Sequence, residues 1–349
     1  MLKNIIKRSI PPKLLPFARF LYRMKSVPRY WIPYAFLDGK AFKPISLHYE
    51  ITFRCNQRCA MCPQQKEKES EDSKIMTAIK CNKELEKEEI YKLADDAEEA
   101  GIKEFTITGG EPFIRKDIID ILSYCSKKSF SLGLLSNGTL IDDEKAEKLV
   151  SLGVNNLQVS IEAGEEIHNK IRNQPNAFKL LLKALDRVNY EKEKQRKSKP
   201  IITFCCTISS LNAPYLSTLL DIAERYEAEV NYGYLFYSTE EMDRKTNEIY
   251  NMGHSKEESQ DISDELKRVD VEALSREIDK IYEISEKKKI PVRFSPPLKG
   301  DEIPKRFSDD SFAYAYKCFY PWYAVRVNPY GDVYPCSMNI TMGNIKDER

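Results

Sequence analysis

The chain has 349 residues, of which 42% are hydrophobic and 31% are charged. This apolar fraction is large enough to build a core, which excludes a globally disordered chain. The formal net charge of +1 gives no electrostatic reason to expect nucleic-acid binding. We find no run near the roughly 20 apolar residues of a membrane span and no apolar signal core, so we expect a cytoplasmic protein.

The first 45 residues are expected to form a short, basic helical extension. They carry ten Lys or Arg residues and one acidic residue, Asp38. Apolar side chains interleave with this charge, a pattern that also fits an amphipathic helix on an anionic membrane surface. Because Pro11 and Pro12 interrupt any long amphipathic face, we favour a helix that packs on the domain over peripheral membrane contact.

From residue 46 the sequence alternates between strand and helix patterns. Apolar and β-branched runs predict strands at Ser46–Thr52, Lys103–Thr108, Ser129–Ser136, Asn155–Ile161, Ile201–Ser209 and Ala228–Phe236. Amphipathic periodicity predicts helices at Leu85–Ala100, Lys116–Lys127, Asp142–Leu152, Ala177–Glu191, Ala213–Tyr226 and Asp264–Lys287. Strands that alternate with helices predict a parallel sheet. The six strands favour an α/β fold, a partial (β/α)6 TIM-like barrel over residues 46–295, with function in the loops at the carboxyl ends of the strands.

Cysteine is the most informative residue type, since three of the nine cysteines lie within eight residues. Cys55, Cys59 and Cys62 follow the first predicted strand with the spacing C-x3-C-x2-C. Disulfides are rare in the reducing cytosol, so such a cluster indicates metal or redox chemistry. Three thiolates on one loop suit an iron–sulfur cluster that leaves one iron open to a ligand. The alternative is a structural zinc site with a distant fourth ligand.

This motif, directly after the first strand of an α/β barrel, resembles the signature of the radical SAM superfamily. The resemblance implies a 4Fe–4S cluster ligated by the three cysteines, with S-adenosylmethionine (SAM) chelated at the open iron. Reductive cleavage of SAM would then give methionine and a 5′-deoxyadenosyl radical, which abstracts a hydrogen atom from the substrate. In such chemistry the protein supplies orientation, electrostatics and exclusion of water.

Further motifs follow in the order of that superfamily. Thr108-Gly109-Gly110-Glu111-Pro112, after the second strand, resembles the GGEP motif that meets the methionyl amino group of SAM. Leu135-Ser136-Asn137-Gly138-Thr139 resembles the element that lines the SAM pocket, and Ser160 and Arg172 resemble a serine and an arginine that approach SAM. The resemblance thus implies a cofactor site formed by Gly109, Gly110, Glu111, Pro112, Ser136, Asn137, Ser160 and Arg172. Glu162 and Ala163 stand where Asp and Gly are commoner, and no role is transferred to Glu162.

After Pro296 and Pro297 the sequence becomes aromatic and rich in turn residues, which indicates a second, small module over residues 296–349. Val325–Asn328 and Val333–Tyr334 flank a turn and predict a β-hairpin, which Cys318 and Cys336 bracket. The pattern resembles the opening of the SPASM or twitch extension, which holds one or two auxiliary iron–sulfur clusters, 4Fe–4S or 2Fe–2S. Buried cysteines in an aromatic cluster, or a zinc pair, are the alternatives. Because no cysteine follows Cys336, we expect either a truncated extension or ligands from elsewhere.

The resemblance therefore implies a radical SAM enzyme of oxidoreductase type that abstracts hydrogen from a polar organic substrate. A sugar or other small molecule is favoured, because Tyr232, Tyr234 and Tyr237 near the end of the sixth strand could stack on a sugar ring, with core packing as the alternative. A peptide-modifying maturase is the alternative substrate class, and a non-catalytic iron–sulfur protein is the alternative of another class. The resemblance implies an external electron donor such as flavodoxin or ferredoxin. No catalytic residue is assigned.

Overall fold

The computed structural model describes residues 32–62, 83–235, 244, 248, 268–298, 302–308, 318–336 and 341–347. Residues 1–31 of the basic extension and Tyr237 lie outside these ranges, so the predictions made for them stay predictions. Within the described ranges, no helix has both the length and the apolar composition needed to cross a membrane.

The described strands form one ten-stranded sheet in the order β10-β9-β8-β1-β2-β3-β4-β5-β6-β7. The eight strands from β8 to β7 in this order run parallel, whereas β9 and β10 are antiparallel to their neighbours. The strands are β1 (Ser46–Glu50), β2 (Glu104–Thr108), β3 (Ser131–Ser136), β4 (Asn156–Ser160), β5 (Ile201–Ile208), β6 (Glu229–Tyr234), β7 (Val292–Ser295), β8 (Ala324–Val327), β9 (Asp332–Tyr334) and β10 (Gly343–Asn344).

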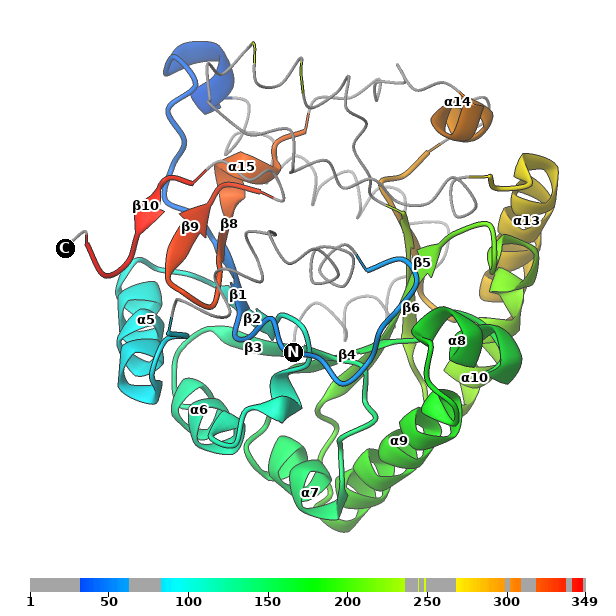
Figure 1. The fold of residues 1–349 in the computed structure, drawn as a ribbon, viewed down its shortest axis with the longest axis horizontal. Helices are drawn as coiled ribbons and strands as arrows, with labels where there is room; N and C mark the ends of the chain where they lie inside the picture. Colours follow the sequence, from blue (N-terminus) through cyan, green and yellow to red (C-terminus); the bar gives the residue numbers. More distant parts are fainter. Residues whose placement is uncertain are drawn as a thin grey trace.

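Helices connect the parallel strands. They are α5 (Lys87–Glu99), η2 (Pro112–Ile114), α6 (Ile118–Cys125), α7 (Asp143–Ser151), α8 (Glu165–Arg172), α9 (Ala177–Lys194), η3 (Ala213–Thr218), α10 (Leu219–Arg225), α13 (Val271–Lys288), α14 (Glu302–Ser308) and α15 (Tyr320–Tyr323). Figure 1 shows the strands curving around the middle of the molecule, with α5 to α10 on the outside of the curve. This arrangement confirms the predicted partial α/β barrel.

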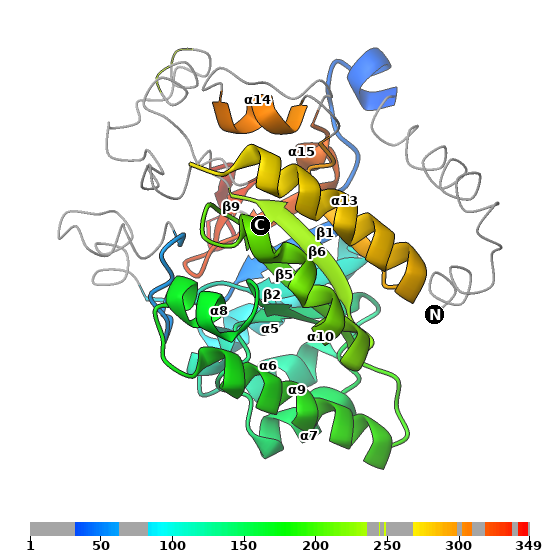
Figure 2. The ribbon, with the colours of Figure 1, turned by 90° about the vertical axis from the view of Figure 1, so that its right-hand side faces the viewer.

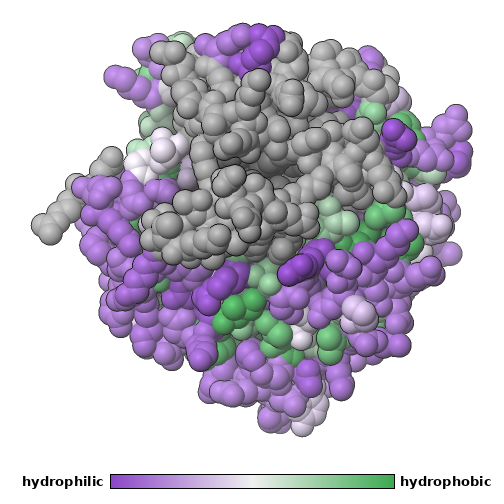
Figure 3. Space-filling model, in the orientation of Figure 1, coloured by the Kyte–Doolittle hydropathy of each residue, from purple (hydrophilic) through white to green (hydrophobic). Residues whose placement is uncertain are grey.

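Side-chain alternation along the strands explains how the core forms. Tyr49 of β1 and Phe105 and Ile107 of β2 are fully buried in one large apolar cluster beneath the helices. Successive side chains of a strand point to opposite faces, so the alternate positions, such as His48 and Glu50, face the inside of the curve. The helices bury their own apolar stripes on the sheet, and the face of the molecule in Figure 3 is largely hydrophilic where helices form it.

The helices begin where their sequences supply caps. The carboxylate of Asp142 accepts a hydrogen bond from the N–H of Lys145 at 2.9 Å, and that of Asp270 accepts one from Ala273 at 2.9 Å. Each cap satisfies one of the backbone donors left free at a helix start. The helix that Asp270 caps, α13, lies across the β6 side of the sheet in Figure 2, packs on η3 and α10, and buries Leu274 in the large apolar cluster.

The predicted C-terminal hairpin is present as β8 and β9. The side-chain oxygen of Asn328 holds its turn by accepting hydrogen bonds from the N–H groups of Tyr330 and Asp332, both at 2.9 Å. Gly331 adopts a φ of +96°, which L-residues with a Cβ rarely take. The sequence did not predict that β8 also pairs in parallel with β1, with Ala324 opposite Ser46. The hairpin therefore continues the barrel sheet.

Candidate active site

The loop that carries Cys55, Cys59 and Cys62 begins just after β1, at the carboxyl end of the sheet. Its middle is anchored on α8, because the N–H of Ala60 donates to the carbonyl of Ile171 at 2.8 Å. Cys59 is buried, while Cys55 and Cys62 are partly exposed. The thiols thus lie at the edge where an α/β barrel places its functional groups.

Gly109 and Gly110 let the loop after β2 pack directly on the cysteine loop. The N–H of Gly110 donates to the carbonyl of Thr52 at 2.7 Å, and the N–H of Glu111 donates to the carbonyl of Arg54 at 2.9 Å. A Cβ on Gly110 would lie 2.3 Å from the Arg54 oxygen, and a Cβ on Gly109 would lie 2.4 Å from the Thr52 oxygen. Only glycine permits these backbone contacts. The backbone of Gly109 and Gly110 thus lies directly against the backbone of the cysteine loop.

Glu111 joins the loop after β2 to the loop after β3. Its carboxylate is 0% exposed and accepts hydrogen bonds from Ser136 Oγ at 2.8 Å, the N–H of Asn137 at 2.8 Å and the N–H of Phe113 at 3.1 Å. Burial raises its pKa to about 7, although these three donors favour the charged form. Both carboxylate oxygens of Glu111 therefore already accept hydrogen bonds from other residues of the protein. Its predicted contact with SAM stays a prediction.

Asn137 links the loop after β3 to the cysteine loop. Its Nδ2 donates to the side-chain oxygen of Asn56 at 2.9 Å, and its own oxygen accepts from the N–H of Thr139 at 2.9 Å. Asn56 completes the network by donating to the Thr139 hydroxyl at 3.0 Å. Asn56 immediately follows Cys55, so this network fixes the first part of the cysteine loop.

Arg172, at the end of α8, lies beside the second cysteine. Its Nη1 donates to Cys59 Sγ at 3.6 Å, and its Nη2 forms an ion pair with Glu162. Arg172 is 8% exposed and Glu162 is 0% exposed. Sequence reasoning transferred no role to Glu162, yet it is the counter-ion of this arginine. The available signal was its place two residues beyond β4 and ten before Arg172.

Two of the predicted cofactor residues occupy the ends of their elements. Ser160 is the last residue of β4 and is partly exposed, whereas Pro112 opens η2 and is buried. The structure thus joins the GGEP loop, the loop after β3 and α8 to the cysteine loop by direct contacts, and it places Ser160 at the carboxyl end of the neighbouring strand.

The chemistry of the donor set fits an iron–sulfur cluster. Three thiols occupy one loop, and the Arg172 guanidinium beside Cys59 would offset part of the negative charge of thiolate ligands. Burial raises the pKa of Cys55 to about 11 and raises that of Cys59, so these thiols are protonated unless a metal binds them. Among the residues that the structure describes, no three His, Cys, Asp or Glu side chains are already arranged to hold a metal. The cysteine side chains would therefore adjust when a cluster binds.

The C-terminal cysteines lie on either side of the hairpin. Cys318 is exposed and Cys336 is partly exposed. Both lie near Tyr320, whose pKa is raised to about 12 by burial, with smaller contributions from the two thiols. The carbonyl of Cys336 accepts a hydrogen bond from Arg326 at 3.4 Å, and Arg326 forms an ion pair with Glu50 of β1 at 2.8 Å. Cys336 is thereby connected, through Arg326, to the strand that leads into the cysteine loop.

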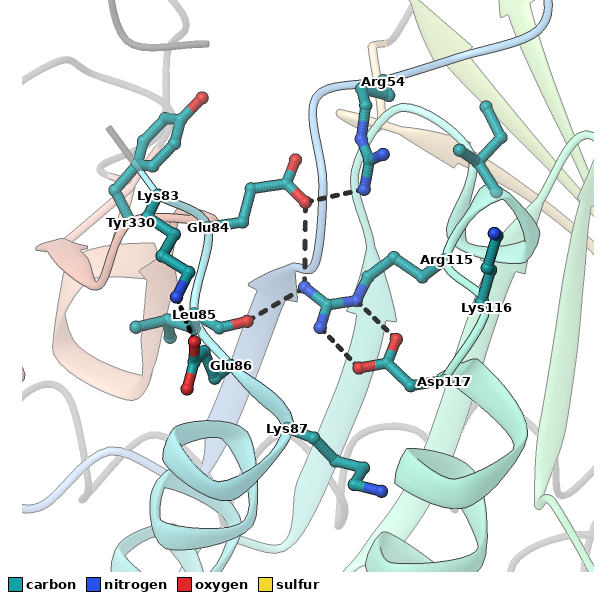
Figure 4. A pocket seen from close by; sticks show the side chains of 11 residues that line it. Arg54, Lys83, Glu84, Leu85, Glu86, Lys87, Arg115, Lys116, Asp117 and Tyr330 are labelled. Carbon is teal, nitrogen blue, oxygen red and sulfur yellow. Dashed lines mark hydrogen bonds and ion pairs between the residues drawn. The ribbon is translucent and has the colours of Figure 1, made fainter. Parts of the chain in front are cut away.

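A pocket of about 610 Å³ lies beside the base of the cysteine loop. Figure 4 shows Arg115 at its centre, held by Asp117 at 2.7 and 3.0 Å and by the carbonyl of Leu85 at 3.1 Å, with Glu84 paired to Arg54 at 3.0 Å. These bonds fasten the segment before α5 to the loop after β2 and to the start of the cysteine loop. None of the three loop cysteines lines the pocket. The pocket is therefore adjacent to the candidate active site and is not part of it.

The tyrosines of β6 pack in the core. Tyr232 is 0% exposed, stacks on Phe294 at 5.0 Å between ring centroids, and donates its hydroxyl to the carbonyl of Leu216 at 3.0 Å. Tyr234 is 8% exposed in the same apolar cluster. The sugar-stacking interpretation of these two rings is therefore wrong, because strand alternation turns them toward the helices.

Comparison with known proteins agrees with these features. A family model described as the radical SAM superfamily matches residues 49–191, and a SPASM model described as an iron–sulfur cluster-binding domain matches residues 318–349. The chain contains a radical SAM domain and a SPASM domain. Its radical SAM domain implies a 4Fe–4S cluster and SAM as cofactors, and its SPASM domain implies auxiliary iron–sulfur binding.

Relatives with different activities match parts of this chain. The Fe-coproporphyrin III synthase of Methanosarcina barkeri is 33% identical over 147 residues, which cover 42% of this chain and 34% of that protein. A PqqA peptide cyclase of Granulibacter bethesdensis is 28% identical over 119 residues, which cover 34% of this chain and 29% of that protein. The chain thus spans about a third of the length of these curated relatives.

Among solved structures, Streptococcus suis SuiB bound to its precursor peptide SuiA has a similar fold. The TM-score is 0.61 at 13% sequence identity, and the likeness covers 88% of this chain and 63% of SuiB. At this identity the comparison supports the shared fold alone.

Proposed function

We propose that the protein is a radical SAM enzyme that cleaves SAM reductively and modifies a peptide substrate. One observation carries the first part of the proposal. The cysteine loop is bonded to the glycine loop after β2, to Asn137 after β3, and to Arg172 on α8. A bare electron carrier would need thiolate ligands but none of these other elements, which speaks against the non-catalytic alternative.

Cys55, Cys59 and Cys62 would hold the cluster, which when bound supplies the electron for SAM cleavage and the open iron at which SAM binds. Arg172 would orient SAM, since its Nε is buried and has no acceptor among the described residues. A carboxylate such as that of SAM would satisfy this donor. Burial lowers the pKa of His168 to about 3, so this neighbouring ring stays neutral and adds no charge to the site.

Apolar side chains around the second cysteine would help to exclude water. Cys59, Met61, Ile171 and Leu235 form a buried cluster at this edge of the sheet. A dry site protects reactive intermediates and strengthens the electrostatic interactions within it.

The peptide substrate is supported by two of the comparisons. One relative is a PqqA peptide cyclase, and SuiB shares the fold and binds a precursor peptide. The sugar interpretation has lost the support of Tyr232 and Tyr234. A small-molecule substrate remains the second candidate, because the Fe-coproporphyrin III synthase matches at 33% identity. We further propose a cytoplasmic enzyme that takes electrons from a low-potential donor of the flavodoxin or ferredoxin kind.

The test has two stages. First, the protein is reconstituted anaerobically with iron and sulfide and incubated with SAM and dithionite, and 5′-deoxyadenosine is quantified. The control is the triple variant Cys55→Ala/Cys59→Ala/Cys62→Ala. Product from the wild type alone is expected, and its absence from a wild type with a full complement of iron would overturn the enzymatic proposal.

The second stage separates the substrate classes. Peptide-sized and small-metabolite fractions are prepared from cells grown in deuterated medium, and each is added to the reconstituted enzyme. Hydrogen abstraction transfers deuterium to 5′-deoxyadenosine, which mass spectrometry detects. Deuterium from the peptide fraction, lost after protease treatment, is the expected result. Deuterium only from the metabolite fraction would replace the peptide proposal with the small-molecule one.

A further inference from the structure

Glu162 is a fully buried carboxylate to which the proposed function gives no role. It lies two residues beyond β4 and is 0% exposed. One oxygen pairs with Arg172, and the other accepts a hydrogen bond from the N–H of Thr207 at 2.9 Å. A buried carboxylate is costly unless it is paired and hydrogen-bonded, and both conditions are met here.

Asn212 fixes this carboxylate from the β5 side. Asn212 is 0% exposed, and its Nδ2 lies within hydrogen-bond reach of the Glu162 carbonyl at 3.2 Å, a Glu162 carboxylate oxygen at 3.4 Å and the Thr207 carbonyl at 2.9 Å. Its oxygen accepts from the N–H of Ser209 at 2.8 Å. The position of the carboxylate is thus set by the loop after β5, independently of the arginine.

Arg172 bridges this fixed carboxylate and the cysteine loop. Its Nη1 is 3.6 Å from Cys59 Sγ while its Nη2 pairs with Glu162. Since the arginine is 8% exposed, water compensates little of its charge. Glu162 therefore allows a guanidinium to stay buried against a thiol.

We propose that Glu162 is a positioning residue that holds Arg172 on Cys59 and sets the reduction potential of the cluster that this cysteine ligates. The inference rests on the proposed function, because it requires a cluster on the cysteine loop. Charges and hydrogen bonds around the sulfurs tune such potentials. A nearby cation favours the reduced cluster because reduction adds negative charge, and a nearby anion disfavours it.

The substitution Glu162→Gln tests the charge. Glutamine keeps the length and one acceptor oxygen, so Arg172 keeps a partner while the negative charge is lost. The uncompensated cation then favours the reduced cluster, and the midpoint potential shifts to a less negative value. Glu162→Asp keeps the charge but shortens the side chain by one methylene, so a smaller shift is expected.

The experiment uses the full chain, reconstituted anaerobically. Redox titration followed by electron paramagnetic resonance gives the midpoint potential, iron analysis gives cluster occupancy, and circular dichroism reports folding. The control is Glu191→Gln, which neutralises another carboxylate of low exposure, paired with Lys194 on α9, and should leave the potential unchanged. A merely structural role for Glu162 would lower occupancy without moving the potential of the clusters that form.

The outcomes separate this inference from the proposed function. A wild type that binds no cluster would refute the proposed function, and this inference with it. A clustered wild type together with an unshifted potential in Glu162→Gln would refute the inference alone. If Glu162→Gln does not fold, Glu162→Asp takes its place in the redox titration. A midpoint potential in Glu162→Asp equal to that of the wild type would then also refute the inference alone. A shift in Glu162→Gln at full occupancy, absent from Glu191→Gln, supports it.

Discussion

The substitution Gly110→Ala is expected to separate the glycine loop from the cysteine loop. The new Cβ would lie 2.3 Å from the carbonyl oxygen of Arg54, whereas contacts of Cβ atoms in proteins essentially never fall below 3.0 Å. The difference, 3.0 minus 2.3, requires a movement of about 0.7 Å. The atoms that the new Cβ would meet are backbone atoms of Phe53 and Arg54. Rotation of a side chain therefore cannot relieve the clash.

The magnitude follows from the bonds that this movement breaks. The hydrogen bond from the N–H of Glu111 to the Arg54 carbonyl, now 2.9 Å, would lengthen to about 3.6 Å, beyond hydrogen-bonding range. Its loss costs about 1 kcal/mol, and overpacking adds about 1–3 kcal/mol. We therefore expect the free energy of unfolding to fall by about 2–4 kcal/mol.

Urea unfolding followed by circular dichroism measures this change in the apoprotein, and iron retained after reconstitution and gel filtration measures the effect on the site. Gly164→Ala is the matched control, since a Cβ there meets no atom within 4 Å and the cost should stay below about 1 kcal/mol. Wild-type stability together with wild-type iron content in Gly110→Ala would refute the reasoning, because the loops would then tolerate separation.

The other predictions concern the same loops. The triple variant Cys55→Ala/Cys59→Ala/Cys62→Ala should lose the iron of this loop while keeping its far-ultraviolet spectrum, and unchanged iron would contradict ligation by these thiols. Because burial raises the pKa of Glu111 from 4.5 to about 7, the folded state binds a proton in that range that the unfolded chain releases. Stability should fall by about 3 kcal/mol as pH rises through this window, and Glu111→Gln should lack this slope in urea unfolding. Asn137→Ala removes three side-chain hydrogen bonds and should cost about 1–3 kcal/mol and reduce iron retention; an unchanged unfolding midpoint would contradict this.

The barrel could be predicted because its signals are local. Each of the six predicted strands has the composition of a buried parallel strand, and the structure reproduces them within a few residues. The cysteine loop was equally visible, since three thiols within eight residues need no tertiary information. Short elements escaped prediction. Helix α8 has eight residues and β7 has four, lengths at which periodicity carries little information.

The partners of the site residues could not be read from the sequence, because they depend on how loops from different strands meet. The sequence placed Gly110 and Glu111 near a ligand, but the structure shows their backbones bonded to Thr52 and Arg54 of the cysteine loop. Glu162 was set aside because it departs from the usual Asp. Its function as counter-ion becomes apparent only when the end of α8 returns Arg172 to the end of β4.

The pairing of β8 with β1 has a consequence for the two groups of cysteines. Ser46 to Tyr49 lie opposite Ala324 to Val327 in parallel register, so the hairpin shares the strand that ends just before Cys55. The ion pair between Arg326 and Glu50, at 2.8 Å, reinforces this contact, and Arg326 also contacts the carbonyl of Cys336. Backbone hydrogen bonds along a strand fix position more firmly than an interdomain linker would. The position of Cys336 relative to the cysteine loop is therefore set by the sheet and by Arg326.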